Sequence, residues 1–240
     1  MNSPYIHISG ENYNPEIEER YNNWYNHVYV PELLMKFEGA TERRRYKLLE
    51  GNDGYPQYLV VGYYYSERPM WKFVESRERR TFDTDRDHEF AGKFEVLWNA
   101  YYEVVKYVNR ETPSAAGDPG ADRPVMYIES YKMPLGEQGK YVNWLSSFGY
   151  NAYLPVLMRS SGLKEYDHYI VMNVDRGTTV PIKYPDNPPY VSFFYFGNVD
   201  DYQRFKSSPE LAVFRERIQS GFQGEVRWSV GYQLVKSWRK

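Results

Sequence analysis

The sequence of 240 residues contains no cysteine. Disulfide bonds, zinc–thiolate sites, iron–sulfur clusters and a cysteine nucleophile are therefore excluded. No apolar run approaches the roughly 20 residues that a membrane-spanning helix requires. The polar start, MNSPYIHISGENYN, does not have the pattern of a signal peptide. From these absences we expect a cytoplasmic protein without a membrane partner.

A strong charge bias is also missing. Lys and Arg total 30 and Asp and Glu total 32, a formal net charge of −2, which argues against nucleic acid as a partner. The sequence has no glycine-rich phosphate loop, no Gly-x-Ser-x-Gly elbow and no paired glycines of a dinucleotide site. A nucleotide cofactor is therefore not expected.

Metal-binding patterns are incomplete. The four histidines lack the spacing of metal ligands between neighbours. Asp83-x-Asp85-x-Asp87 begins like a calcium loop, but His88 stands where glycine is required and Phe94 where the closing Glu belongs. We interpret this segment as a solvated, acidic helix start, and we predict no metal and no cofactor.

Tyrosine is what the sequence has in excess. There are 26 Tyr residues, and aromatic residues make up 18% of the chain. A tyrosine is apolar along its ring and polar at its tip, so it can line a semi-polar cavity as well as pack a core.

Four motifs recur in the same order in the two halves of the chain. They are Tyr-x-x-Trp (from Tyr21 and Tyr141), Gly-x6-Tyr (from Gly39 and Gly162), a Tyr-rich run (from Tyr58 and Tyr190) and Trp-x3-Tyr-x2-Val-Lys (from Trp98 and Trp228). This order indicates a tandem duplication. We assign a first module to residues 1–108 and a second to 125–240. Residues 109–124, NRETPSAAGDPGADRP, have no large apolar side chain to bury and are predicted to be a linker.

Hydrophobic periodicity predicts the same element order in both modules: strand, helix, strand, strand, helix, strand. In the first module a helix begins after Asn14, and Pro31 should kink or end it. In the second module one helix is predicted from Val199 to Gln219. The fold class is therefore α+β, with two ferredoxin-like modules that each have both helices on one face of an antiparallel sheet.

Two segments resemble a known superfamily. WYNHVYVPELLMKFEG followed by RRRY resembles the first helix and second strand of EthD-like dimeric α/β-barrel proteins, and FKSSPELAVFRERI from Phe205 resembles the second helix of their antibiotic-biosynthesis-monooxygenase relatives. The resemblance implies that the two modules close an α/β barrel within one chain, with a pocket inside it. Such families include cofactor-free monooxygenases, isomerases, polyketide cyclases and haem proteins. Their members also form oligomers readily, so this chain is allowed a homo-oligomeric state as one alternative. EthD-like members often carry a histidine where this chain has Tyr29, and no role is transferred to His27.

Strand alternation separates an apolar side of each predicted strand from a side that carries both polar and apolar residues, here called the mixed side. Because a face under helices is fully buried, we predict that the apolar side, with Ile6, Ile8 and Ile128, packs against the helices. The mixed side then faces the barrel interior. The residues placed there are Arg43, Arg45, Tyr101, Glu103, Tyr166, His168, Arg227 and Gln233, together with His7 and Glu129, which the repeat makes equivalent.

This set of side chains suggests a small-molecule site. In a cofactor-independent enzyme, His7 or His168 would be the general base, Arg45 would hold a developing enolate or carboxylate, and Glu129 would orient an imidazole. The reaction would be a cyclisation, isomerisation or monooxygenation of an aromatic or polyketide-like compound. Glu103, Tyr101, Tyr166 and Arg227 would line the ligand.

Two other hypotheses use the same residues. A non-catalytic ligand-binding or assembly protein would also contain buried His–Glu and Arg–Glu pairs, because each side chain supplies the hydrogen-bond partner that the other needs. A haem protein with His168 as axial ligand is the third hypothesis. The long segment Asn173–Pro189 is predicted to be a flap over one mouth of the barrel, with Tyr184 or Lys183 reaching the opening, or else an oligomer contact.

Overall fold

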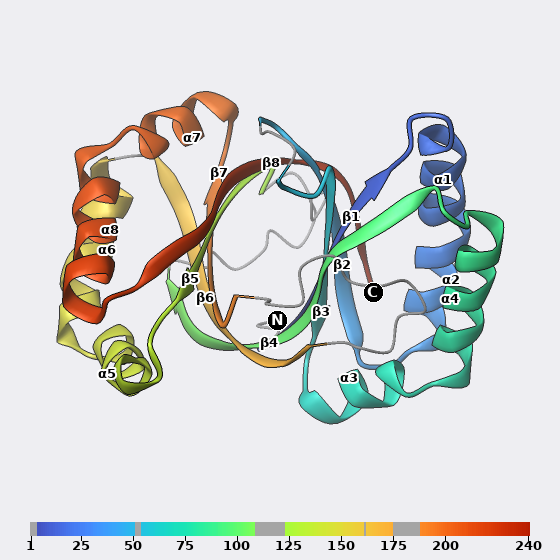
Figure 1. The fold of residues 1–240 in the computed structure, drawn as a ribbon, viewed down its shortest axis with the longest axis horizontal. Coiled ribbons are helices and arrows are strands. Elements are labelled where there is room, and N and C mark those ends of the chain that lie inside the picture. The colour runs from blue at the N-terminus through green and yellow to red at the C-terminus, as the bar shows by residue number, and fades with distance from the viewer. Residues whose placement is uncertain (1–3, 51–53, 109–122, 161, 175–187) are drawn as a thin grey trace. The chain divides into compact units, whose positions relative to one another are not determined.

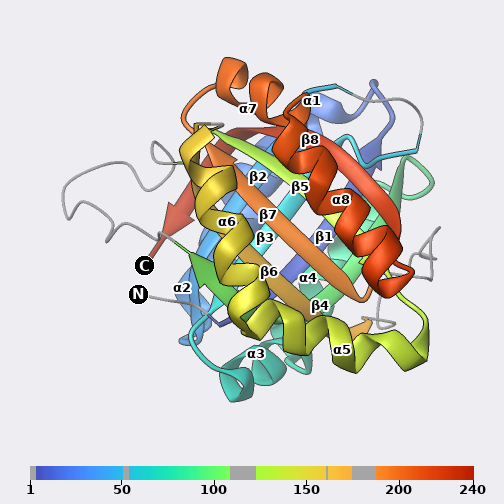
Figure 2. The same cartoon turned by 90° about the vertical axis from the view of Figure 1, so that its left-hand side faces the viewer.

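The computed structural model describes residues 4–50, 54–108, 123–160, 162–174 and 188–240. Figure 1 shows the strands and helices of these ranges, and Figure 2 shows the helices of the second half lying over their strands. No helix within them is long and apolar enough to cross a membrane.

The elements follow the predicted order in both halves. The first half contains β1 (Tyr5–Tyr13), α1 (Glu18–Trp24), the π-helix η1 (Tyr25–Tyr29), α2 (Val30–Lys36), β2 (Ala40–Leu48), β3 (Tyr58–Tyr64), α3 (Glu67–Val74), α4 (Arg77–Glu89) and β4 (Phe94–Val108). The second half contains β5 (Val125–Lys132), α5 (Leu135–Ser146), α6 (Phe148–Ser160), β6 (Leu163–Val174), β7 (Tyr190–Phe196), α7 (Val199–Lys206), α8 (Pro209–Phe222) and β8 (Glu225–Arg239).

The hydrogen-bonded strand order is β1-β3-β2-β8-β5-β7-β6-β4, a closed barrel. The predicted α+β class with two ferredoxin-like modules in one barrel is confirmed. The chain forms two compact units: among the described residues, unit 1 holds those up to Glu103 plus 172–174 and 235–240, and unit 2 holds 104–108, 123–171 and 188–234. Most of the predicted linker, residues 109–122, lies outside the described residues.

Two helices differ from their predicted course. The predicted helix from Val199 to Gln219 is two helices, because the Ser208 hydroxyl caps α8 by accepting from the Leu211 amide at 3.2 Å and Pro209 occupies its first turn. Around Pro31 the helical path passes from α1 through η1 into α2, and the proline lies in the first turn of α2. Proline lacks an N–H, and the first turn of a helix needs none.

The strand register corrects one of the predicted equivalences. His7 pairs with Gly62 and Tyr101, and Tyr127 pairs with Phe194 and Gly231 at the same distance from the bulge in its own sheet. Tyr127, not Glu129, is therefore the counterpart of His7. The predicted equivalence of Arg45 and His168 is confirmed, since they face the corresponding residues Val60 and Ser192.

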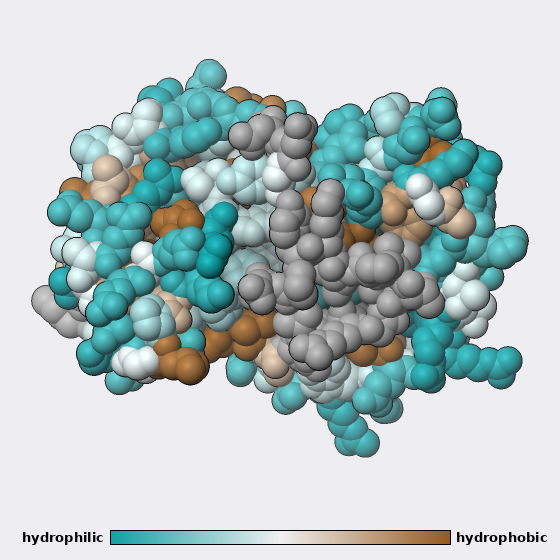
Figure 3. All heavy atoms as spheres, viewed as in Figure 1, coloured by the Kyte–Doolittle hydropathy of each residue, from teal (hydrophilic) through white to brown (hydrophobic). Residues whose placement is uncertain are grey.

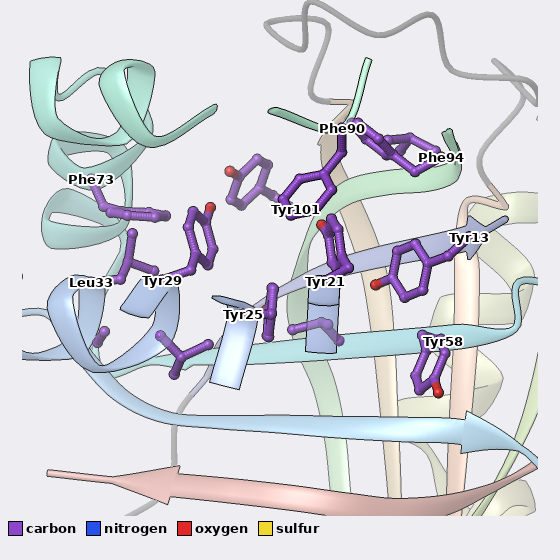
Figure 4. Close-up of a cluster of buried hydrophobic side chains, with 14 of the residues drawn as sticks. Tyr13, Tyr21, Tyr25, Tyr29, Leu33, Tyr58, Phe73, Phe90, Phe94 and Tyr101 are labelled. Carbon is purple, nitrogen blue, oxygen red and sulfur yellow. The ribbon is translucent and has the colours of Figure 1, made fainter. Parts of the chain in front are cut away.

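Aromatic side chains fill the space between sheet and helices in unit 1. Figure 4 shows the rings of Tyr21, Tyr25, Tyr29 and Phe73 gathered there with Tyr101 of β4. Hydrophilic residues cover much of the face seen in Figure 3. The tyrosine excess of the sequence is therefore used mainly in the interior.

Candidate functional site

The polar residues of both sheets lie under the helices, so the predicted assignment of faces is wrong. In unit 1, Arg45 donates to Asn22 of α1 at 2.6 Å, and Tyr101 accepts a hydrogen bond from Arg79 of α4 at 3.1 Å. In unit 2, Glu129 accepts from Arg215 of α8 at 2.6 Å. Arg45, Tyr101 and Glu129, which were predicted to point away from the helices, point toward them.

The physical reason is that both faces of each sheet are buried. Ile6, Ile8 and Ile128, which were assigned to the helices, are fully buried on the opposite face. Burial therefore does not require that the more apolar face be the one that packs against the helices. The polar face is tolerated under them because helix residues supply its hydrogen-bond partners.

A row of four paired residues crosses the sheet of unit 1. Arg43 of β2 pairs with Gly62 of β3, Gly62 pairs with His7 of β1, and His7 pairs with Tyr101 of β4. Residues paired in this way share one face of the sheet. Gly62 has no side chain, and the guanidinium of Arg43 lies over it: a Cβ at this position would be 3.2 Å from Nη2 of Arg43.

The imidazole of His7 is held in one orientation. Its Nε2 donates to Oδ1 of Asn99 at 2.5 Å, and its ring stacks on Tyr101 with 4.5 Å between centroids. With the proton on Nε2, the neutral ring has Nδ1 as its proton acceptor. A histidine oriented by an amide in this way can serve as a general base.

Residues of three helical segments cover this row. Tyr25 and Tyr29 come from η1, and Phe73 comes from α3. A π-helix is rare and is often found at functional positions. Together with α4 they enclose a cavity of about 30 Å³, which is room for one or two water molecules. Its lining is completed by Ser9, Glu11, Val60, Arg79, Asp83, Arg86, Val96 and Asn99.

The acidic groups of the cavity are engaged by other side chains. Asp83 lies 3.3 Å from Arg79 and 3.5 Å from Arg86. Glu11 accepts from the hydroxyls of Tyr13 at 2.6 Å and Tyr21 at 3.1 Å. The contact of Tyr21 with Glu11 ties α1 to the sheet, whereas these two ion pairs of Asp83 lie within α4.

The tyrosines of the lining are phenols at neutral pH. Burial raises the pKa of Tyr25 to about 12. Burial, and then the charge of Asp83, raise the pKa of Tyr29 well above its usual range. Neither hydroxyl therefore supplies a negative charge to the cavity.

The interpretation of Asp83 as part of a solvated helix start is wrong. Asp83 lies within α4 and is buried, as are Arg79 and Arg86. The three residues stand at i, i+4 and i+7, the spacing of one helix face. That spacing is the sequence signal that identifies them as buried. Asn99 lies two residues before Tyr101 on β4, so strand alternation places both on one face.

Arg45 is buried in an aromatic cage. Its guanidinium lies 4.4 Å from the ring centroid of Tyr58 and 4.7 Å from that of Tyr25, and it donates to Asn22 and Asn26. Arg45 thus fixes α1 and η1 on the sheet.

In unit 2 the corresponding polar face is closed by pairing. Glu129 is fully buried and accepts from Tyr127 at 2.6 Å, from Tyr131 at 2.5 Å and from Arg215. Ser229 also receives a hydrogen bond from Arg215, at 2.8 Å. Glu129 contacts these groups and no histidine, so the structure does not bring it to His7 or His168 as an orienting partner.

His168 is fully buried among aromatic residues. Its Nδ1 lies 2.8 Å from the Ser192 hydroxyl and 3.3 Å from the Tyr166 hydroxyl, and the Tyr141 ring meets its ring edge-on at 5.7 Å. Burial lowers the pKa of His168 to about 3. The imidazole is therefore neutral at physiological pH.

The surroundings of His168 do not fit a haem. An axial ligand must present a ring nitrogen to open space beside it. His168 has no exposed surface and packs between Tyr141 and Tyr190, whose ring centroids lie 5.7 and 6.2 Å from its own.

The remaining predicted residues lie elsewhere. Glu103 and Arg227 are exposed, and Arg227 pairs with Glu225 at 3.0 Å. Tyr184 and Lys183, with most of the predicted flap, lie outside the described residues. Within the described ranges, no group of three or more His, Asp or Glu residues is placed to hold a metal ion.

No protein-family model matches the chain, and no curated protein matches it. Solved structures share its fold at low sequence identity. An anthrone oxidase-like protein has 12% identity and a TM-score of 0.63, over 98% of this chain and 93% of its own. A dye-decolorizing peroxidase of Bacteroides thetaiotaomicron has 8% identity and a TM-score of 0.58, over 98% and 93%.

A third solved structure is a variant of the chlorite dismutase of Candidatus Nitrospira defluvii in complex with cyanide. It has 10% identity and a TM-score of 0.52, over 98% of this chain and 92% of its own. These neighbours share the two-module α+β barrel architecture, and at such identities the likeness concerns the fold.

Proposed function

We propose that unit 1 carries the active site of a cofactor-independent enzyme, with His7 as its general base. The substrate would be an aromatic or polyketide-like compound, and the reaction would be a cyclisation, isomerisation or monooxygenation that begins with proton transfer. The observation that carries the proposal is the buried His7 imidazole, oriented by Asn99 in a cavity walled by Tyr25, Tyr29 and Phe73. An EthD-like relationship, a cytoplasmic location and homo-oligomer formation belong to the same proposal.

The first step needs only groups of this chain. The C–H bond next to a substrate carbonyl breaks, its proton passes to Nδ1 of His7, and its electron pair moves onto the carbonyl oxygen as an enolate. Asn99 accepts from Nε2 and stabilises the imidazolium that forms. The fate of the enolate then separates the reaction types: reprotonation at another carbon, attack on a second carbonyl, or reaction with dioxygen.

The size of the cavity sets a condition on this function. About 30 Å³ is far below the roughly 300 Å³ of a typical small-molecule site. Binding of an aromatic compound therefore requires the covering side chains, Phe73 and the two tyrosines of η1, to move outward.

The experiment follows proton abstraction directly. Candidate anthrones and aromatic ketones are incubated with the protein in D₂O, and deuterium uptake next to the carbonyl is measured by NMR. We expect His7→Gln to lower the exchange rate at least 100-fold, and His88→Gln, at an exposed histidine, to leave it unchanged. Equal exchange by the wild type and His7→Gln would remove His7 from the mechanism.

The small cavity specifically favours a second candidate, a non-catalytic ligand-binding protein. In that case the wild type binds a ligand at the His7 cavity but does not accelerate deuterium uptake in any compound tested. The same exchange experiment, combined with binding measurements, separates the two functions.

A further inference from the structure

We propose that Arg43 is an anion-binding residue, and that the molecule bound at this site presents a single carboxylate or enolate oxygen group to it. The inference rests on the proposed function for the location of the site, and it adds the substrate class. It concerns a residue whose surroundings differ from those of every other arginine in the Arg43–Arg45 run.

The guanidinium of Arg43 is buried without a partner. Arg43 is 3% exposed, lines the cavity, and makes no hydrogen bond or ion pair with any residue of the described ranges. Its near neighbour is the ring of Phe73, 6.0 Å from the guanidinium carbon. An arginine stays protonated at physiological pH, so a full positive charge faces the cavity.

Each of the adjacent arginines has a hydrogen-bond partner, although Nη1 of Arg44 and Nε of Arg45 are buried without one among the described residues. Arg44 donates from Nε to Glu42 at 2.6 Å, and Arg45 donates to Asn22 at 2.6 Å. A buried charge without a partner is strongly unfavourable, and proteins rarely keep one. An anion from solution would remove this penalty.

No acid of the cavity can take the place of that anion. Asp83 is shared by Arg79 and Arg86, and Glu11 is held by the hydroxyls of Tyr13 and Tyr21. Asp87, the next carboxylate on α4, lies 2.8 Å from Arg86. Each of these three carboxylates is paired with a group other than Arg43, and Oδ2 of Asp87 is buried without a hydrogen-bond partner in the described ranges.

Gly62 provides the space for the side chain of Arg43. A Cβ at this position would lie 3.2 Å from Nη2 and 3.3 Å from Nε of Arg43. Gly62 is also paired with His7 on its other side. Gly62 therefore lets the guanidinium that would hold an oxyanion lie over the residue paired with His7, the base that would create it.

The second half of the chain has neither an arginine nor a glycine at the positions that correspond to Arg43 and Gly62. Tyr166 stands at the register position of Arg43, and Phe194 stands at that of Gly62. Their rings meet edge-on at 4.8 Å between centroids. Unit 1 therefore has a charge packed over a glycine where unit 2 has two aromatic rings.

The cavity volume limits the anion to a small monovalent group. About 30 Å³ accommodates a carboxylate head group in place of one or two waters. A phosphate is larger and carries close to two charges, while a single guanidinium faces it. We therefore expect formate and acetate to bind and inorganic phosphate not to bind.

The test titrates sodium formate into the full-length protein at constant ionic strength and follows the unfolding midpoint and the heat of binding. We expect saturable binding by the wild type, and at least tenfold weaker binding by Arg43→Met and by Gly62→Ala, whose new methyl group would displace the Arg43 guanidinium. Arg77→Met, at an exposed arginine of α4, should bind formate like the wild type. Phosphate should give no saturable effect.

A second measurement distinguishes an anion site from a structural arginine. In buffer without small carboxylates, Arg43→Met should unfold at the same temperature as the wild type or higher, because an unpaired charge is removed. A lower midpoint for Arg43→Met in that buffer, or equal formate affinity in wild type and variant, would overturn the proposal. So would the absence of saturable binding by the wild type.

The outcome is separable from that of the proposed function. Formate binding that depends on Arg43, without deuterium uptake in any compound, leaves an anion site and removes the enzyme. Deuterium uptake that depends on His7, without formate binding, leaves the enzyme and removes the anion site.

Discussion

The two buried histidines differ in what surrounds them. His7 donates to Asn99 and lines a polar cavity, whereas His168 is enclosed by aromatic rings and the Ser192 hydroxyl. Desolvation without a compensating negative charge keeps His168 neutral. The same residue type therefore has a chemical role available in unit 1 and a packing role in unit 2.

Neutral burial of His168 predicts a pH-dependent loss of stability. Its folded pKa of about 3 lies below the ordinary value of 6.5. Above pH 6.5 the residue contributes nothing to the pH dependence. Below pH 6.5, His168 becomes protonated in the unfolded chain but stays neutral in the folded chain down to about pH 3. Unfolding free energy then falls by about 1.4 kcal/mol per pH unit from this residue alone.

Replacing His168 by Gln should remove this slope while retaining a hydrogen bond to Ser192. We expect urea unfolding at pH 7.5, 6 and 5 to show that the stability deficit of the variant shrinks as the pH falls. His88→Gln, at an exposed histidine, serves as control. Parallel stability profiles for His168→Gln and wild type would contradict the neutral burial of His168.

At the scale of elements, periodicity predicted the order of strands and helices because alternation and helical spacing are local properties. Which face of a strand meets the helices is not a local property. Both faces of each sheet are buried, so the relative polarity of Ile6 and His7 did not reveal which of them meets the helices.

The register was mispredicted for a related reason. The similarity of the letters around His7 and Glu129 suggested their equivalence, whereas the bulges after Gly10 and Ser130 fix the pairing. The cavity residues from α4, Arg79 and Asp83, could have been found from their helical spacing. Their partnership with the sheet needed the tertiary structure.

The C-terminal end of α8 offers a test of local backbone strain. Gln223 ends this helix in the left-handed conformation, with φ of 51°. A side chain in this conformation is unfavourable by about 1 kcal/mol, and glycine avoids it. Gln223→Gly should therefore raise the free energy of unfolding by about 0.5–1 kcal/mol.

The matched control lies one turn earlier on the same helix. Gln219 is also exposed but is inside α8, so Gln219→Gly should lower the free energy of unfolding by a similar amount. Urea denaturation of the two variants measures both changes. A loss of stability at both positions would contradict the assigned end of the helix.

At the scale of the whole molecule, three strands contribute residues to both compact units. β4 passes from unit 1 to unit 2 after Glu103, β6 passes from unit 2 to unit 1 after Val171, and β8 does so after Leu234. The backbone of each of these strands therefore runs through both units. This continuity predicts one cooperative unfolding unit in place of two independent modules.

Native-state hydrogen exchange tests the prediction with a change confined to unit 2. Glu129→Gln weakens the buried ion pair with Arg215, and we expect it to lower the free energy of unfolding by about 3 kcal/mol. The amides of β3 in unit 1 and β7 in unit 2 should lose the same protection, because both exchange through the same global opening. Glu216→Gln, on the exposed side of α8, should change neither strand. Loss of protection in β7 alone would instead show that the two halves of the duplicated chain unfold independently.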